Sequence, residues 1–310
     1  MNPILMYDLT IIGGGPAGVS AGVYAARKLL KTFFIAPEFG GQSIVSDDIQ
    51  NWIGTPHIAG AKLAKDLEEH LKAYAGDIVD IKSESAVDIQ KTESGFIVTT
   101  DKGSYETKTI LIATGSHRRK LDIPGAKEYD HRGVTYCASC DGPFFTGLDV
   151  TVIGGGNAAF ESAAQLLAYA KSVTILNRTE TFRADELTVK KIGEHSNITI
   201  IKNAVPVEIL GEKLATGIVY EDQISKEKIT LNTPGIFVEI GAVPTTEFAK
   251  KVVELNPLGY IPVDPRNQQT KTPGIWSAGD CTDGLYHQNN IAAGDAVKAL
   301  EDIYLYLKAK

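Results

Sequence analysis

Two cysteines separated by two residues are the side chains best suited to redox chemistry in this chain. The segment from Cys137 to Gly142 reads CASCDG, and two thiols at this spacing can cycle between a dithiol and a disulfide. If the segment opens a helix, the helix dipole favours the thiolate form. Asp141 stands beside the second sulfur, where a carboxylate can move a proton. We therefore predict that Cys137, Cys140 and Asp141 form a catalytic redox centre.

The other cysteines and histidines offer no competing chemistry of equal strength. The chain has only three cysteines, too few for the disulfide framework of a secreted protein. A zinc site is disfavoured because a second Cys-x-x-Cys and a His-x3-His are both missing from the sequence. We expect Cys281 to be a packed free thiol. Among the histidines, His287 alone is placed to approach a cofactor, and we predict no metal site and no catalytic histidine.

The elements that must position the cysteines include a pattern that occurs twice. Each copy is an apolar strand, a glycine-rich loop and an alanine-rich run compatible with a helix; the loops read GGGPAG at 13–18 and GGGNAA at 154–159. Such a loop binds a dinucleotide because glycines allow close backbone approach and the helix N-terminus offers free N–H groups to the pyrophosphate. Two copies predict one nucleotide held permanently and one that exchanges, as in a flavoenzyme fed by NADPH or NADH.

Further periodic segments lie between and after the two loops. Residues 61–75 have the pattern of an amphipathic helix, and residues 96–100 and 109–115 read as strands. Near the C-terminus, a short apolar strand ends in Gly-Asp within 274–280, and the run from Asn290 to Leu307 fits a final helix. We expect this last part of the chain to return to the first domain.

The bulk composition limits the functional classes. With 310 residues, 43% hydrophobic and 22% charged, the chain is long enough for two globular cores. A formal net charge of -7 argues against nucleic-acid binding, since no excess of cations neutralises phosphates. The uncharged stretch Leu9 to Ala26 is interrupted by Gly13 to Pro16, so we expect no membrane span. No secretory signal is evident, and we predict a cytoplasmic protein.

Several short motifs, in this order along the chain, carry a family resemblance: GGGPAG at 13–18, GGQ at 40–42, ATG at 113–115, CASCDG at 137–142, GGGNAA at 154–159 and AGD at 278–280. On these motifs the chain resembles, over nearly its whole length, the low-molecular-weight thioredoxin reductases. These are class II enzymes of the FAD-dependent pyridine nucleotide-disulfide oxidoreductase family. The chain is also similar to the flavoprotein subunit of alkyl hydroperoxide reductase around GVTYCASCDGP and GIFVEIG. That flavoprotein carries a further N-terminal thioredoxin-like part, which we do not expect before a glycine loop that begins at Gly13.

The resemblance implies a fold and a domain plan. The fold would be α/β, with two Rossmann-like dinucleotide-binding domains in three ββα layers, the second inserted into the first. The FAD-binding domain would comprise 1–118 and 246–310. The pyridine-nucleotide-binding domain would comprise 119–245 and carry the cysteine pair, with hinges near 116–120 and 241–246. The family also implies a homodimer.

Binding residues follow from the resemblance motif by motif. FAD would be surrounded by Gly13, Gly15, Pro16, Ala17, Gly18, Glu38, Gly40, Gly41, Gln42, Asn51, Ala113, Thr114, Gly115, Gly279, Asp280 and Gln288. For Glu38, the candidate ribose-binding acid, a solvated loop carboxylate is an equal alternative. NAD(P)H would be bound by Gly154, Gly156, Asn157, Ala158, Ala159, Arg178 and Arg183.

The resemblance also implies roles for the redox centre. Cys140 would be the sulfur next to the flavin and form the charge-transfer contact, Cys137 would attack the partner's disulfide, and Asp141 would be the acid/base. Electrons would pass from NAD(P)H through FAD to thioredoxin or a thioredoxin-like protein. The alternatives are a peroxiredoxin-type partner, a dithiol oxidase, a flavoprotein fed by ferredoxin, and a flavin redox sensor without turnover.

The chain departs from the family where the nucleotide is selected. The family's NADPH motif is His-Arg-Arg followed three residues later by Arg, whereas this chain has Asn177-Arg178-Thr179 and Arg183. Each charge-assisted contact to a 2'-phosphate is worth about 1.5 to 3 kcal/mol, so one missing arginine weakens the preference for NADPH. No acidic residue ends the preceding strand to hold a bare 2'-hydroxyl. NADPH is therefore favoured over NADH.

Overall fold

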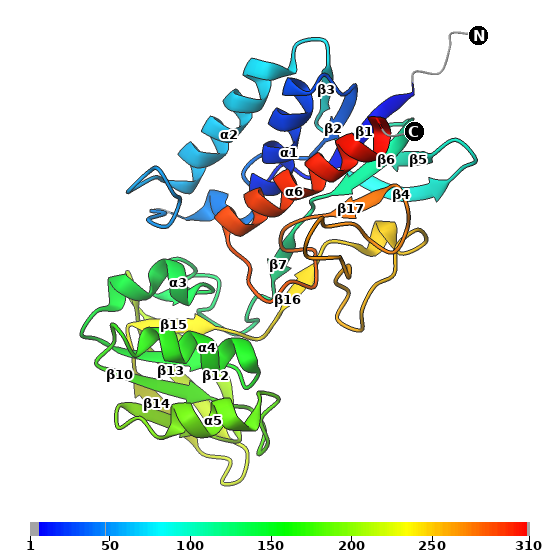
Figure 1. Cartoon of the computed structure of the whole chain (residues 1–310). Coiled ribbons are helices and arrows are strands. Elements are labelled where there is room, and N and C mark those ends of the chain that lie inside the picture. The colour runs from blue at the N-terminus through cyan, green and yellow to red at the C-terminus, as the bar shows by residue number, and fades with distance from the viewer. Residues whose placement is uncertain (1–5, 47, 309–310) are drawn as a thin grey trace. The chain divides into compact units, whose positions relative to one another are not determined.

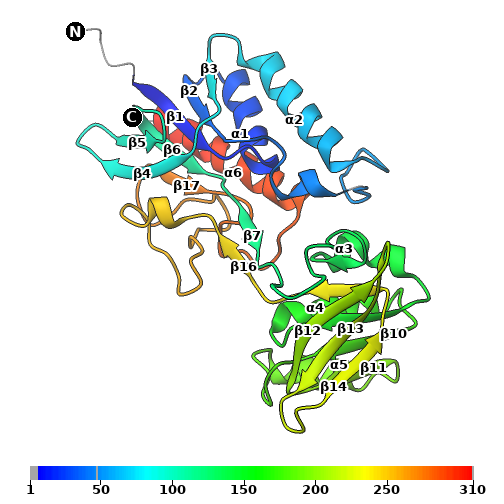
Figure 2. The ribbon, with the colours of Figure 1, turned by 180° about the vertical axis from the view of Figure 1, so that it is seen from behind.

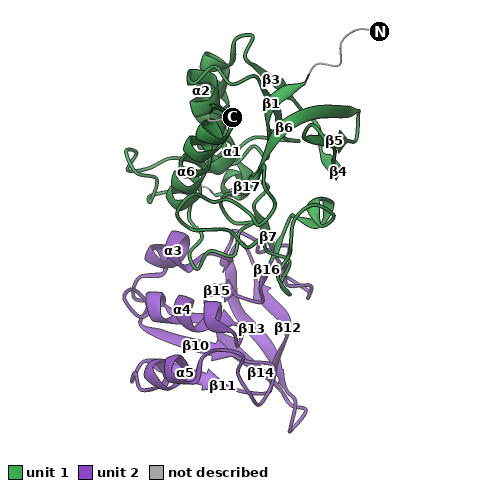
Figure 3. Cartoon of the chain, turned by 45° about the vertical axis from the view of Figure 1, so that its right-hand side comes forward, with its two compact units in different colours: residues 1–117, 243–310 green, residues 118–242 purple. Residues whose placement is uncertain are grey.

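The computed structural model describes residues 6–46 and 48–308 and divides into two compact units (Figure 3). Unit 1 joins residues 1–117 to residues 243–310, and unit 2 is the continuous stretch 118–242. The chain passes between the units in strands β7 (Ser116–Arg118) and β16 (Ala242–Pro244), which pair as a two-stranded sheet. Unit 2 is thus inserted between two segments of unit 1.

Unit 1 is built on a parallel sheet that antiparallel strands extend at one edge (Figure 1). The strand before the first glycine loop lies between its two parallel neighbours, and a strand from the C-terminal segment joins the same sheet, as the sequence indicated. The parallel strands are β1 (Tyr7–Ile12), β2 (Thr32–Ile35), β3 (Val79–Lys82), β6 (Ser104–Ile112) and β17 (Ile275–Ser277), and the antiparallel pair is β4 (Ala86–Lys91) and β5 (Phe96–Thr100).

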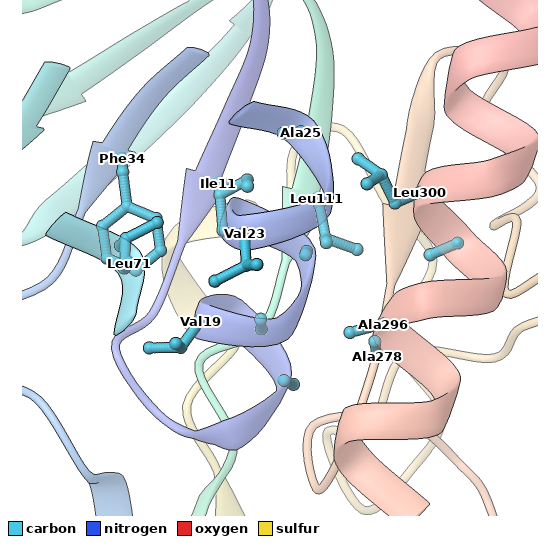
Figure 4. Packing of buried hydrophobic residues seen from close by; sticks show 14 of the residues in the cluster. Ile11, Val19, Val23, Ala25, Phe34, Leu71, Leu111, Ala278, Ala296 and Leu300 are labelled. Atoms are coloured by element: carbon cyan, nitrogen blue, oxygen red, sulfur yellow. The ribbon is translucent and has the colours of Figure 1, made fainter. Parts of the chain in front are cut away.

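Three helices cover one face of this sheet: α1 (Pro16–Arg27), α2 (Gly60–Ala75) and α6 (Asn289–Lys308). Helix α2 buries Leu63, Leu67 and Leu71, which recur every four residues and so form one apolar stripe. Helix α1 lies against the sheet and against α6, and its buried side chains meet those of the strands and of α6 in one core (Figure 4). Two short 3-10 helices, η1 (Gly41–Val45) and η3 (Glu247–Ala249), lie in connecting segments.

Unit 2 has three layers, with α-helices on one face of a parallel sheet and a small antiparallel sheet on the other (Figure 2). The parallel sheet has the strand order β11-β10-β9-β15-β8. Its strands are β8 (Val134–Thr135), β9 (Asp149–Ile153), β10 (Ser172–Leu176), β11 (Ile198–Ile201) and β15 (Gly235–Val238); the antiparallel strands are β12 (Ala204–Gly211), β13 (Ala215–Asp222) and β14 (Lys228–Asn232); the helices are α3 (Ala138–Asp141), η2 (Gly142–Phe145), α4 (Asn157–Leu166) and α5 (Glu186–Gly193).

Alternation of side chains along the central strands of unit 2 produces these layers. Val152 and Phe237 are buried under the helices, whereas the next residue of each strand, Ile153 and Val238, is buried under the antiparallel sheet. Because successive side chains of a strand point to opposite faces, a strand covered on both sides is apolar throughout. The predicted α/β fold of two Rossmann-like domains, one inserted into the other, is confirmed.

The helix after the second glycine loop is shorter than the sequence pattern predicts. The alanine-rich run that is compatible with a helix continues to Ala170, but α4 ends at Leu166. Beyond that residue the chain tightens, because Ala168 donates to the carbonyl of Gln165 and Tyr169 to that of Leu166. Such i to i+3 bonds close the last turn of a helix.

Among the described residues, no helix combines the length and apolar character needed to cross a membrane.

Candidate functional site

Cys137 and Cys140 form a disulfide in unit 2, with their Cα atoms 5.3 Å apart. They belong to the single helical turn α3, as the sequence suggested, and Cys137 is its N-cap residue. The backbone N–H of Cys140 donates a hydrogen bond to Sγ of Cys137 at 3.2 Å. Both cysteines are partly exposed. Reduction therefore leaves the Cys137 sulfur with a backbone donor, which stabilises a thiolate at the sulfur assigned to attack a partner.

Asp141 closes the same helical turn as the two cysteines. Its backbone N–H donates to the carbonyl of Cys137 at 3.0 Å, and its carboxylate accepts a hydrogen bond from the Thr135 hydroxyl. Thr135 is buried at the end of β8, so the strand anchors the carboxylate. The sequence analysis did not identify Thr135. A hydroxyl residue two positions before the first cysteine is the signal that could have found it.

The disulfide segment is attached to the helix that begins at the second glycine loop. The Ser139 hydroxyl donates to Oε1 of Gln165 on α4 at 2.8 Å, and Gly142 lies against Leu166. From the start of α4 at Asn157 to Gln165 the helix rises by roughly 12 Å, at 1.5 Å per residue. The second glycine loop and the disulfide segment thus lie at opposite ends of α4.

The second glycine loop forms an open cradle at the N-terminus of α4. Gly154 has a φ of +151°, and a Cβ there would overlap the carbonyl oxygen of Glu239, so only glycine fits. Gly156 is the N-cap of α4, and a Cβ there would meet nothing within 4 Å. Asn157 and Ala158 are exposed beside it, and Ala159 is buried. The open space and the free N–H groups fit a pyrophosphate.

Both candidate arginines lie near this loop. Arg183 donates its backbone N–H to the carbonyl of Gly155 at 2.8 Å, and Arg178 stands two residues after the end of β10. Both side chains are exposed, and neither guanidinium is paired with a carboxylate within the described ranges. Asn177, which is buried, donates to the carbonyls of Thr179 and Thr181 at 2.7 and 3.0 Å. This side chain therefore holds the turn that brings Arg183 to the loop.

The first glycine loop forms a similar cradle in unit 1. Gly13 has a φ of +125°, and a Cβ there would overlap the carbonyl oxygen of Ala113. Gly15 is the N-cap of α1, and a Cβ there would have only the Cα of Gly41 in range, at 3.9 Å. The N-terminus of α1 is therefore accessible to an anionic group, and its geometry fits the pyrophosphate of a second dinucleotide.

Loops from distant parts of the sequence meet around this cradle. Gly40 donates to the carbonyl of Gly14 at 2.9 Å. The Asn51 side chain donates to Oε1 of Gln288 at 3.1 Å, which links the segment after η1 to the N-terminus of α6. The residues predicted to surround FAD lie in the loops that follow the strands of unit 1 and in the segments next to those loops. They are Gly13, Gly15, Pro16, Ala17, Gly18, Glu38, Gly40, Gly41, Gln42, Asn51, Ala113, Thr114, Gly115, Gly279, Asp280 and Gln288.

Not every predicted flavin residue offers a free polar group. The Thr114 hydroxyl donates to the carbonyl of Thr245 at 2.6 Å and is already engaged. Glu38 and Gln42 are exposed.

His287 lies beside the ring of Tyr260 at 5.9 Å between centroids, and its Nε2 is buried without a hydrogen-bond partner in the described chain.

Cys281 is a buried free thiol, as predicted. Burial raises the pKa of the Cys281 thiol, and the neighbouring Ser277 hydroxyl opposes this rise. A thiol that resists ionisation is a poor nucleophile. Within residues 6–46 and 48–308, His, Cys, Asp and Glu side chains do not gather in threes as a metal site requires.

Comparisons with known proteins relate most of the chain to curated relatives. The family model described as pyridine nucleotide-disulphide oxidoreductase matches residues 7–296. The F subunit of alkyl hydroperoxide reductase from Staphylococcus aureus is 40% identical over 302 residues, covering 97% of this chain and 59% of that protein. NADH dehydrogenase of Bacillus subtilis is 38% identical over 301 residues, covering 97% of this chain and 58% of that protein. The chain spans about three fifths of the length of these curated relatives.

Solved structures match over nearly the full length of both chains. Thioredoxin reductase from Streptococcus pyogenes has a TM-score of 0.90 at 34% identity, covering 98% of this chain and 99% of that chain. Thioredoxin reductase from Giardia duodenalis has a TM-score of 0.91 at 33% identity, covering 97% and 99%. These matches confirm the resemblance drawn from the motifs. The chain therefore belongs to the pyridine nucleotide-disulphide oxidoreductase family.

Proposed function

We propose that this protein is a thioredoxin-disulfide reductase, which takes electrons from NAD(P)H and delivers them through FAD and the Cys137–Cys140 pair to thioredoxin or a thioredoxin-like protein. The observation that carries the proposal is a partly exposed disulfide anchored to the helix of a glycine-loop nucleotide fold. Membership of the family implies a flavin and a nicotinamide cofactor. The cradles at Gly15 and Gly156 fit FAD in unit 1 and the nicotinamide nucleotide in unit 2. FAD, when bound, would supply the two-electron transfer from the nucleotide to the disulfide.

The side chains of unit 2 perform the thiol chemistry. Two electrons and one proton convert the disulfide to the Cys140 thiol and the Cys137 thiolate, and Asp141 delivers the proton to the Cys140 sulfur. The Cys137 thiolate, held by the N–H of Cys140, attacks one sulfur of the partner's disulfide and forms a mixed disulfide. Cys140 then loses its proton to Asp141 and attacks Cys137. The two released sulfurs of the partner take one proton from Asp141 and one from water, so the partner leaves as a dithiol and the Cys137–Cys140 disulfide forms again.

Replacing Asp141 by asparagine tests the proton transfer. We expect Asp141→Asn to lower turnover with thioredoxin by about 100-fold or more, because an amide cannot deliver or accept the proton. The pH dependence of kcat should flatten, which the loss of a purely structural residue would not cause. Asp122→Asn, which makes the same change at an exposed carboxylate of unit 2, is the matched control and should retain turnover. Turnover of Asp141→Asn within two-fold of wild type would contradict the assignment.

The nucleotide loop supports NADPH over NADH. Arg178 and Arg183 are two exposed cations near one glycine loop, and the nearby carboxylate Glu180 is paired with Lys202 at 2.9 Å. We expect Arg183→Gln to raise the KM for NADPH by about ten-fold and to leave the KM for NADH unchanged, because only NADPH carries the 2'-phosphate. Lys190→Gln, an exposed cation of α5, is the control. Steady-state KM values for both nucleotides provide the measurement, and an equal loss for both would refute the assignment.

An anaerobic titration tests the proposed function directly. NADPH and then NADH are added to the flavin-loaded protein, flavin bleaching is recorded, and oxidised thioredoxin is supplied to the reduced protein. The 40% identity to the F subunit of alkyl hydroperoxide reductase favours a peroxiredoxin-type disulfide as the second candidate substrate, so that protein is assayed in parallel. Oxygen consumption with small dithiols would identify a dithiol oxidase. If only reduced ferredoxin bleaches the flavin, the electron donor is not a nicotinamide nucleotide. If no donor bleaches the flavin, the reductase proposal is overturned.

A further inference from the structure

A buried carboxylate lies at the end of strand β15 in unit 2. Glu239 follows the strand directly, and its side chain is only 4% exposed. It lies on the same side of the sheet as Phe237, two residues earlier, and therefore under α4. A charged residue inside the apolar run GIFVEIG contradicts the pattern of a strand covered on both faces, where every side chain is expected to be apolar.

Two donors contact the Glu239 carboxylate. The Ser162 hydroxyl of α4 donates to Oε1 at 2.7 Å, and Nη1 of Arg118 donates to Oε2 at 3.3 Å. Burial raises the pKa of the Glu239 carboxyl; Arg118 and Ser162 oppose the rise, and Glu161 on α4 adds to it. A carboxylate has about four lone-pair positions that accept hydrogen bonds. Glu239 thus retains acceptor capacity beyond these two contacts.

The position of Glu239 in the sheet connects it to the nucleotide loop. In the strand order β11-β10-β9-β15-β8, the chain adds β10 and β11 on one side of β9 and later adds β15 on the other side. The boundary between β9 and β15 is therefore a topological switch point. Ligands of open α/β sheets bind at the carboxyl ends of the strands at such a switch point. Glu239 lies there, since its N–H donates to the carbonyl of Ile153 at 2.8 Å and its own carbonyl oxygen lies against Gly154.

The two sides of the glycine loop differ in the groups that they offer. On the β10 side stand the cations Arg178 and Arg183, which suit the phosphate of an adenosine half. The loop itself, open at Gly156, suits the pyrophosphate. A dinucleotide laid across the loop therefore places its nicotinamide half on the opposite, β15 side. That side carries Glu239, an acceptor-only group, and the nicotinamide carboxamide has an –NH2 donor.

We propose that Glu239 positions the nicotinamide half of the bound nucleotide by accepting a hydrogen bond from the carboxamide –NH2 group. This inference rests on the proposed function, because it requires unit 2 to bind a nicotinamide nucleotide. It deepens that function by assigning a residue to the half of the ligand that the glycine loop and the arginines do not reach.

Calorimetric titration of the flavin-loaded protein with two ligands tests the assignment. NADP+ carries the carboxamide and does not reduce the flavin, whereas 2'-phospho-ADP-ribose lacks the nicotinamide ring. For Glu239→Gln we expect about ten-fold weaker binding of NADP+, because a charge-assisted hydrogen bond becomes a neutral one, and unchanged binding of 2'-phospho-ADP-ribose. Glutamine keeps the shape of the side chain and removes a charge that burial disfavours, so the variant should fold.

Glu227→Gln is the matched control. It makes the same change at an exposed residue in the turn between β13 and β14, in the antiparallel-sheet layer, so both ligands should bind as in wild type. A pH series adds a second measurement. Lowering the pH through the raised pKa of Glu239 should weaken NADP+ binding to wild type, and Glu239→Gln should remove this dependence. The other charged groups facing Glu239 are Arg118 on β7 and Glu161 on α4.

The outcomes separate the two levels of inference. Equal weakening of both ligands, no weakening of either, or the same selective loss in Glu227→Gln would show that Glu239 does not position the nicotinamide half, and would overturn the assignment. If wild type itself binds neither ligand, the proposed nucleotide site fails, whatever the variants do.

Discussion

Replacing Cys137 by serine should abolish turnover of the partner's disulfide and leave reduction of the flavin by the nucleotide intact. A serine hydroxyl accepts the same backbone N–H as the cysteine sulfur, so the turn α3 persists. It does not ionise near neutral pH and cannot displace a thiolate, and removal of a nucleophile typically lowers kcat by more than about 1,000-fold. Anaerobic stopped-flow bleaching of the flavin and steady-state assays with thioredoxin and peroxiredoxin disulfides measure the two half-reactions.

Two further variants define this result. Cys140→Ser keeps the attacking sulfur but loses the one that releases the partner, so a stable mixed disulfide through Cys137 should accumulate and be visible by mass spectrometry. Cys281→Ala removes the buried third cysteine and should retain turnover. Normal turnover in Cys137→Ser would refute the roles assigned to the two sulfurs.

Alanine at Gly15 should strip FAD from the protein without unfolding it. The added Cβ has only the Cα of Gly41 within 4 Å, so the fold of unit 1 tolerates it. It would, however, occupy the N-terminus of α1, where the pyrophosphate must approach the backbone closely. We expect FAD binding to weaken by at least about ten-fold, equivalent to about 1.4 kcal/mol. The ratio of flavin to protein absorbance after gel filtration measures retention.

Gly13→Ala is the matched comparison for that prediction. Here the added Cβ would overlap the carbonyl oxygen of Ala113, and the φ of +125° is unfavourable for alanine. Overpacking and backbone strain together should cost about 3 kcal/mol or more of folding free energy. Thermal unfolding of the apoproteins should therefore separate the two variants. Full FAD retention in Gly15→Ala would show that Gly15 does not form the pyrophosphate cradle.

Local patterns explain how much of this protein the sequence predicted. Both glycine loops, the Cys-x-x-Cys turn and the strands that precede them depend on backbone freedom, periodicity and capping over fewer than about ten residues. The end of α4 cannot be predicted from the sequence, because the alanine-rich run has the same helix propensity before and after Leu166. The structure shows i to i+3 bonds from Leu166 onward, and no local signal marks that change.

The sequence by itself determined the α/β class, the duplicated strand, glycine loop and helix pattern, and the Cys-x-x-Cys turn, because each follows from residues close together in the chain. Only the tertiary structure shows that the Thr135 hydroxyl donates to the Asp141 carboxylate. It also shows that Asn177 packs against the second glycine loop and that Glu239 lies beside Gly154. Glu239 reaches Gly154 because β9 and β15 pair in parallel, although many residues of sequence separate them. Contacts of this kind depend on which strands become neighbours, and that is decided by burial across the whole unit rather than by any short segment.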